Sequence, residues 1–120
     1  MSSDDTETLA AMMVQVDRFC ACVKSLVDDT AADSDTDELR LKLNQARAML
    51  ADLQGFYNEG KLDIEKAAVR SEFRALIITL MWVAFRARMI IDYKIFRMLV
   101  SIESAFSLLM ERYSHQESCD

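Results

Sequence analysis

Large apolar side chains recur along the chain at alternating intervals of four and three residues. One such row falls within residues 6–28 and consists of Leu9, Met13, Val16, Cys20, Val23 and Val27. A second row falls within residues 36–58 and consists of Leu39, Leu43, Ala46, Leu50, Leu53 and Tyr57. Because an α-helix completes a turn in 3.6 residues, this spacing gathers the side chains into one stripe that packs against other helices. The pattern therefore predicts an all-α protein.

Turn-forming residues are too scarce for the main alternative folds. The 120 residues include 2 glycines and no proline, whereas β-sandwiches, barrels and βα units need such residues at most of their turns. Hydrophobic residues make up 52% of the chain, which excludes intrinsic disorder for most of it. The length is that of one domain. We therefore predict a single helical bundle over residues 1–120.

An acidic segment, residues 28–37, separates the first two predicted helices and is expected to be a loop. Asp33, Asp35 and Asp37 reproduce the alternate aspartates that open a calcium-binding EF-hand loop. A glutamate and an asparagine stand where that loop needs its glycine and its bidentate glutamate. No metal site is expected, and Asp35 with Glu38 is interpreted as a capping box that opens the second helix.

Residues 61–114 contain no glycine, proline or polar cluster that would mark a turn. Their apolar row is Val69, Phe73, Leu76, Leu80, Val83 and Ala87, followed by Ile91, Ile95, Met98, Ile102, Ala105 and Leu109. Two successive steps of four, from Val83 to Ala87 to Ile91, form a stutter that shifts the row around a helix without ending it. Two architectures remain: one helix of about 50 residues, or a break near residues 86–94 that gives four helices. In either case we expect three to four antiparallel helices.

Residues 75–102 are apolar on nearly every side, as expected for a central helix. The two N-terminal helices are too short to cover a long helix of this kind, so we expect a dimer or another protein to cover the remainder. The predicted interaction row is Leu76, Leu80, Val83, Ala87, Ile91, Ile95, Met98 and Ile102.

The net charge of −6 is unevenly distributed. Residues 1–60 carry 5 basic and 12 acidic side chains, and residues 61–113 carry 9 basic and 6 acidic ones. The overall acidity argues against general nucleic-acid binding. Arginines recur in the C-terminal half at Arg70, Arg74, Arg86 and Arg97. They either neutralise the acidic half of the same chain or form a basic face for a phosphate or an anionic membrane.

Few residues are suited to catalysis. The chain has one histidine, His115, and three cysteines without a Cys-x-x-Cys pair, so we expect no catalytic, metal or cofactor site. The absence of a disulfide pattern favours an intracellular, cytoplasmic location. The longest uncharged apolar run, residues 75–85, is about half the length of a membrane-spanning helix.

We therefore expect a non-enzymatic protein that self-associates or binds a protein partner through its C-terminal half, acting as an adaptor, chaperone or regulatory subunit. The alternative is a compact bundle that captures a partner's amphipathic helix or docks on an anionic membrane surface. The chain is similar in size and helical content to small viral Bcl-2-like proteins. It lacks their Asn-Trp-Gly-Arg and Leu-x-x-x-Gly-Asp motifs, so the similarity is one of class alone.

Overall fold

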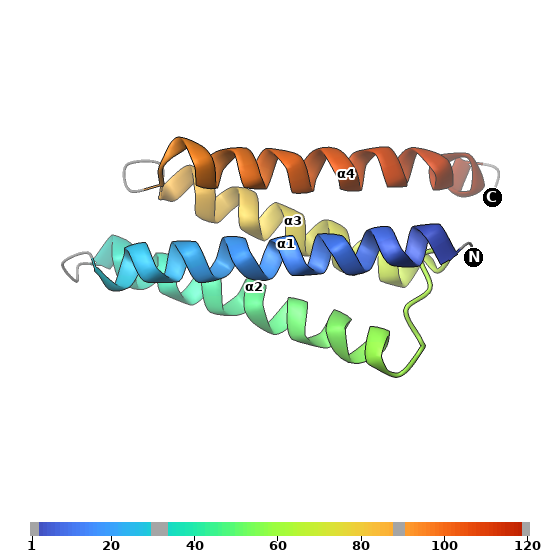
Figure 1. The fold of residues 1–120 in the computed structure, drawn as a ribbon, viewed down its shortest axis with the longest axis horizontal. Coiled ribbons are helices and arrows are strands. Elements are labelled where there is room, and N and C mark those ends of the chain that lie inside the picture. The colour runs from blue at the N-terminus through green and yellow to red at the C-terminus, as the bar shows by residue number, and fades with distance from the viewer. Residues whose placement is uncertain (1–2, 30–33, 88–90, 119–120) are drawn as a thin grey trace.

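The structure is a computed structural model that describes residues 3–29, 34–87 and 91–118, with the side chains of residues 5–29, 36–87 and 91–113. These residues form four α-helices and no strand (Figure 1). The helices are α1 (Ser3–Asp28), α2 (Ser34–Asn58), α3 (Ala67–Arg86) and α4 (Tyr93–Ser118). The prediction of an all-α helical bundle is confirmed. The calcium-loop residue Asp33 and the side chains of Asp35 and His115 lie outside the described residues.

Each helix runs back along the one before it, so the chain passes up and down the molecule (Figure 1). Packing follows a closed ring, in which α1 contacts α2 and α4, and α3 contacts the same two helices. The contact between α3 and α4 is the sparsest of the four. The molecule measures 48 × 26 × 23 Å, which is little longer than its longest helices.

The core is built from the rows that the spacing predicts. In α1 and α2 every predicted row member except Tyr57 is buried, and in α3 the row from Val69 to Ala87 is buried throughout. Phe73 of α3 stacks on Phe106 of α4, with ring centroids 6.2 Å apart. Burial of this apolar surface is the main force that holds the four helices together.

The second helix ends in a glycine cap. Gly60 has a φ of +72°, a conformation that side chains with a Cβ rarely adopt. Its N–H donates to the carbonyl of Tyr57, and the N–H of Lys61 donates to the carbonyl of Phe56. This pair of bonds is the Schellman motif, which satisfies carbonyls that the end of a helix leaves open.

The helix predicted to begin at residue 61 begins instead at Ala67. Between the two helices, the Asp63 carboxylate accepts a hydrogen bond from the N–H of Glu65, and its carbonyl accepts one from the N–H of Lys66. Such a turn competes with helix formation. Leu62 and Ile64 are buried, so this connection covers one end of the bundle with apolar side chains.

The interpretation of residues 61–114 as one continuous helix is wrong, because α3 ends at Arg86 and α4 begins at Tyr93. The Asp92 carboxylate accepts a hydrogen bond of 2.9 Å from the N–H of Ile95. Asp92 is therefore the N-cap of α4, and it supplies the start signal that glycine or proline would otherwise give. The other predicted architecture, with a break near residues 86–94, is the one observed, and the break coincides with the stutter in the apolar row.

Because α4 starts afresh at Tyr93, its buried row is shifted from the predicted one. The buried side chains are Ile95, Leu99, Ile102, Phe106, Leu109 and Tyr113. The predicted members Met98 and Ala105 are only partly buried. This row packs against α1 and α3, so the chain itself covers much of the apolar surface that was expected to need a second copy.

The two ends of the chain are joined by a buried carboxylate. Asp5 of α1 is 5% exposed and accepts hydrogen bonds from the Arg112 guanidinium and the Tyr113 hydroxyl of α4. Burial, together with the bond to Asp5, raises the pKa of Tyr113 to about 12. A buried acid is tolerated because it is paired and hydrogen-bonded.

Candidate functional site

The predicted interaction row lies inside the folded chain. Leu76, Leu80, Val83, Ala87, Ile95 and Ile102 are buried, and Ile91 and Met98 are partly buried. These side chains come together as parts of the four-helix core. A partner that approaches the folded chain meets other residues first, so the interaction surface must be sought outside the predicted row.

A second row with the same spacing lies on the outside of α3. It runs through Arg74, Ile78, Met81 and Phe85, at intervals of four, three and four. Ile78 is 60% exposed, Met81 49% and Phe85 67%. Large apolar side chains this exposed on one face are a feature of interaction surfaces rather than of a completed core.

Helix α4 carries a matching outer row, which runs through Phe96, Val100, Glu103 and Ser107 at the same intervals. Phe96 is 50% exposed and Val100 46%. Both outer rows can be found in the sequence, because each helix carries a second row with intervals of four and three residues beside its core row. Sequence reasoning assigned this all-round apolar character to a central helix and therefore missed the surface.

The two outer rows line a groove between α3 and α4. One cavity of 440 Å³ lies toward Arg74 and another of 320 Å³ lies toward Phe85 and Phe96. Met81 and Glu103 line both cavities, so the two are adjacent. We call this surface the α3–α4 groove and define it by Arg74, Ile78, Met81, Phe85, Phe96, Val100, Glu103 and Ser107.

The groove exists because α3 and α4 separate as they leave the segment that joins them (Figure 1). Near the far end, Arg70 of α3 is 3% exposed. Its guanidinium donates to the carbonyls of Ile64 and Glu65 at 2.8 Å and lies over the ring of Tyr113, 5.5 Å from the centroid. Arg70 therefore ties α3 to the preceding connection and to α4, and its charge is used within the fold.

The structure brings two of the four arginines of the predicted basic face together, because Arg70 and Arg74 line the same cavity, and it places the other two elsewhere. Arg74 lines the groove. Arg86 lies at the other end of α3, 3.5 Å from the Glu38 carboxylate of α2 and 5.3 Å from the centroid of Trp82. Arg97 of α4 lies over the ring of Tyr93. The bond to Glu38 agrees with the alternative in which these arginines neutralise acids of the same chain.

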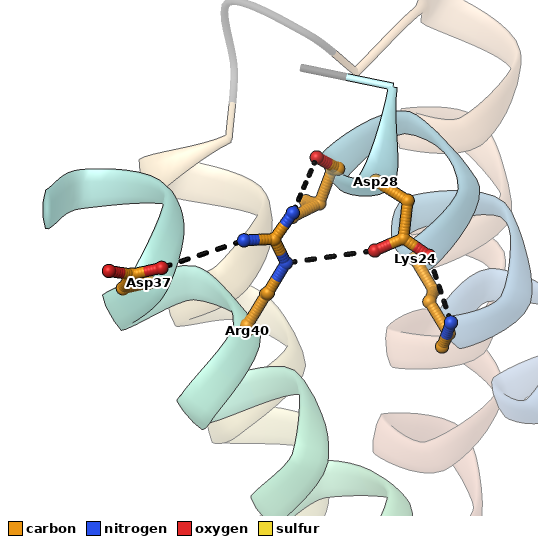
Figure 2. Close-up of polar contacts among 5 residues, drawn as sticks. Lys24, Asp28, Asp37 and Arg40 are labelled. Carbon is orange, nitrogen blue, oxygen red and sulfur yellow. Dashed lines mark hydrogen bonds and ion pairs between the residues drawn. The ribbon is translucent and has the colours of Figure 1, made fainter. Parts of the chain in front are cut away.

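The flanks of the acidic segment are neutralised by neighbouring bases (Figure 2). Arg40 of α2 lies 3.6 Å from the Asp28 carboxylate and 3.5 Å from that of Asp37, and it donates to the carbonyl of Val27. Lys24 donates to Asp28 at 2.9 Å. This bond and the charges of Lys24 and Arg40 hold the pKa of Asp28 below its usual range. Arg40 therefore holds the end of α1 against the start of α2.

The described residues do not gather metal-ligating side chains, and the thiol of Cys20 is shielded from solvent. No group of three or more histidine, cysteine, aspartate or glutamate side chains among them could hold a metal ion. Cys20 is buried, and burial raises the pKa of its thiol to about 11, so little of it is thiolate at neutral pH. Among the described helices, none is long and apolar enough to span a membrane.

Comparison of the chain with known protein families, with curated proteins and with solved structures found no match. The α3–α4 groove and its residues are therefore the features of the molecule that bear on its function.

Proposed function

We propose that this chain is a non-enzymatic interaction protein and that the α3–α4 groove is its binding surface. The observation that carries the proposal is the groove of two adjacent cavities lined by Ile78, Met81, Phe85, Phe96 and Val100, all about half exposed or more. A helical bundle does not need these side chains for its own core, because its buried rows are already complete. Apolar clefts between helices are common sites of protein and ligand binding.

Self-association, the first expectation from the sequence, is retained as one way in which the groove could be filled. A symmetric dimer would use the same face on both copies. The row once expected to form that interface is buried, so a second copy would have to contact the outer rows. An anionic membrane surface is a further candidate, since the exposed rings of Phe85 and Phe96 stand at one end of the groove and Arg74 lines the other end.

Site-specific photo-crosslinking in cells that produce the chain tests the proposal. A benzoylphenylalanine at position 78 lies in the groove, and the same residue at position 108 replaces Leu108, which is 66% exposed on α4 outside the groove lining. We expect discrete protein adducts from position 78 and none of the same mass from position 108. The mass of each adduct separates a second copy of 13.7 kDa from another protein. The absence of adducts from position 78 would refute the groove as a protein-binding surface.

A further inference from the structure

We infer that the α3–α4 groove is the interface of a symmetric homodimer whose two-fold axis runs along the groove. In this dimer the α3 wall of one copy faces the α4 wall of the other. The inference rests on the proposed function and adds the identity and the orientation of the partner. The charges of the two walls, the change in polarity along the groove and the exposed apolar area support it.

The charged side chains of the groove are sorted by wall. The larger cavity is lined by Arg70 and Arg74 from α3, and by Glu103 and Glu111 from α4. At this end of the groove the α3 wall is therefore basic and the α4 wall is acidic, with two charges of each sign. The charge of Arg70 is used within the fold, whereas Arg74 forms no ion pair with any residue that the structure describes.

A surface fits a copy of itself only when the two-fold operation brings unlike charges together. A two-fold axis along the groove exchanges the walls, so Arg74 of each copy faces the second copy's Glu103 and Glu111 on the acidic wall. The contact occurs twice, once on each side of the axis. A surface shaped for an unrelated partner has no reason to meet this condition, and the α3–α4 groove meets it.

The polarity of the groove meets the same condition. Counted from the segment that joins the two antiparallel helices, both outer rows advance by four, three and four residues (Figure 1). Phe85 and Phe96 begin these rows at the apolar end of the groove, and Arg74 and Ser107 end them at the polar end. An axis along the groove keeps the apolar ends together and the polar ends together.

A two-fold axis across the groove would pair unlike ends and like walls. It would place the ring of Phe85 near Arg74 of the second copy and would bury charged groups against apolar ones, which costs free energy. It would also lay the basic α3 wall of one copy on the basic α3 wall of the other. Charge and polarity therefore select the same axis independently.

The outer rows have the spacing of a bundle core. Intervals of four and three residues are those at which helices pack side by side in coiled coils and four-helix bundles. When the groove of one copy meets that of a second copy, α3 and α4 of both supply four helices whose outer rows face a common centre. The dimer then repeats between copies the packing that each chain already has within itself.

The exposed apolar area is sufficient for a dimer of modest affinity. Phe85 is 67% exposed and Phe96 is 50% exposed, which together leaves roughly 200–300 Å² of ring surface in water. Ile78, Met81 and Val100 add a similar area. A symmetric interface buries the patch twice, so roughly 1,000 Å² of apolar surface leaves water, and the charged rim brings the total to the lower end of stable interfaces. We expect a dissociation constant on the order of micromolar, below which the single folded chain predominates.

Sedimentation velocity of the purified full-length chain, over a wide range of concentration, tests the inference. Arg74→Glu and Glu103→Lys each reverse the charge of one wall, and Phe85→Asp/Phe96→Asp is the groove-defective variant. Lys94→Glu is the charge-reversal control, because Lys94 is exposed on α4 and lines neither cavity. Circular dichroism checks that every variant keeps its helicity, and native mass spectrometry identifies mixed dimers by their mass.

We expect the parent and Lys94→Glu to form a species of twice 13.7 kDa as concentration rises. Each wall reversal places like charges opposite one another twice, so Arg74→Glu or Glu103→Lys alone should weaken the dimer about tenfold. The groove-defective variant should weaken it at least about tenfold. Mixing Arg74→Glu with Glu103→Lys should restore association as a mixed dimer, because a copy with two acidic walls then meets a copy with two basic walls. The doubly reversed Arg74→Glu/Glu103→Lys variant should again dimerise with itself.

Several outcomes would overturn the inference. A parent that stays monomeric at every concentration would do so, as would a dimer that the groove-defective variant leaves intact. Failure of the two wall reversals to form a mixed dimer would exclude the axis along the groove. A monomeric parent that sediments with phosphatidylserine vesicles would identify a lipid surface as the occupant instead.

The two proposals can fail separately. A monomeric parent that gives discrete adducts with another protein from position 78 would reject the second copy and keep the groove as a protein-binding surface. A monomeric parent without any adduct from position 78 would reject both.

Discussion

Truncating two aliphatic side chains two residues apart on α3 tests which face of this helix belongs to the core. Leu80 is fully buried, and Ile78 is 60% exposed on the groove side. Leu80→Ala and Ile78→Ala each remove three carbon atoms and leave the same residue in the same helix. The two variants therefore differ mainly in the burial of the side chain that is removed.

The expected difference in the free energy of unfolding is large. A buried leucine truncated to alanine costs about 2–5 kcal/mol, because transfer energy is lost and a cavity remains. Domains of this size are stabilised by about 5–15 kcal/mol in total, so Leu80→Ala should remove a substantial fraction. Ile78→Ala removes little buried surface and gains slightly in helix propensity, so its effect should lie within about 0.5 kcal/mol of zero.

Urea denaturation followed by circular dichroism, at two protein concentrations, measures both effects. A shift in midpoint with an unchanged slope reports stability alone, and independence of concentration shows that the measurement concerns the single chain. Equal costs for the two variants, or a larger cost for Ile78→Ala, would show that α3 is rotated relative to the core described above. A loss in Leu80→Ala that disappears at high protein concentration would place Leu80 in an interface between copies.

Gly60→Ala should cost about 1 kcal/mol of stability, because φ at Gly60 is +72°. Gly55→Ala should instead stabilise the protein by about 0.5–1 kcal/mol, because Gly55 has a helical backbone and open space around its Cβ position. The same urea assay measures both effects. Asp92→Ala should cost about 1 kcal/mol by removing the N-cap of α4, and Asp92→Asn should restore most of it. Tyr113 has a pKa of about 12, above the value of about 10 for an unfolded tyrosine, so its protonated form favours folding. This contribution is complete below pH 10 and is lost as the pH rises to 12; Tyr113→Phe should flatten that decline, and a decline equally steep in the variant would refute the assignment.

The sequence was sufficient to predict the helical class and most of the core rows, because the four-three spacing depends only on the geometry of one helix. The ends of α1 and α2 were placed within about three residues for the same reason. The sequence left open whether the chain breaks between α3 and α4, because no glycine or proline marks the break. The signal there is one capping aspartate, Asp92, within an apolar segment. The start of α3 was missed because the turn at Asp63 contains no glycine or proline.

The candidate site was harder to predict, because it depends on how helices face one another. The spacing shows that both Leu80 and Met81 belong to apolar rows, yet only packing decides which row is buried and which lines a groove. The role of Arg70 was likewise unpredictable. Its partners are backbone carbonyls of residues 64 and 65, which carry no signature in the amino-acid sequence.

The hydrogen bonds that Asp5 accepts from Arg112 and Tyr113 hold the first turn of α1 against the C-terminal part of α4. Residues separated by more than one hundred positions are neighbours, so loss of the first turn of α1 would uncover the last turns of α4. A fluorophore attached near one end would sense fraying at the other.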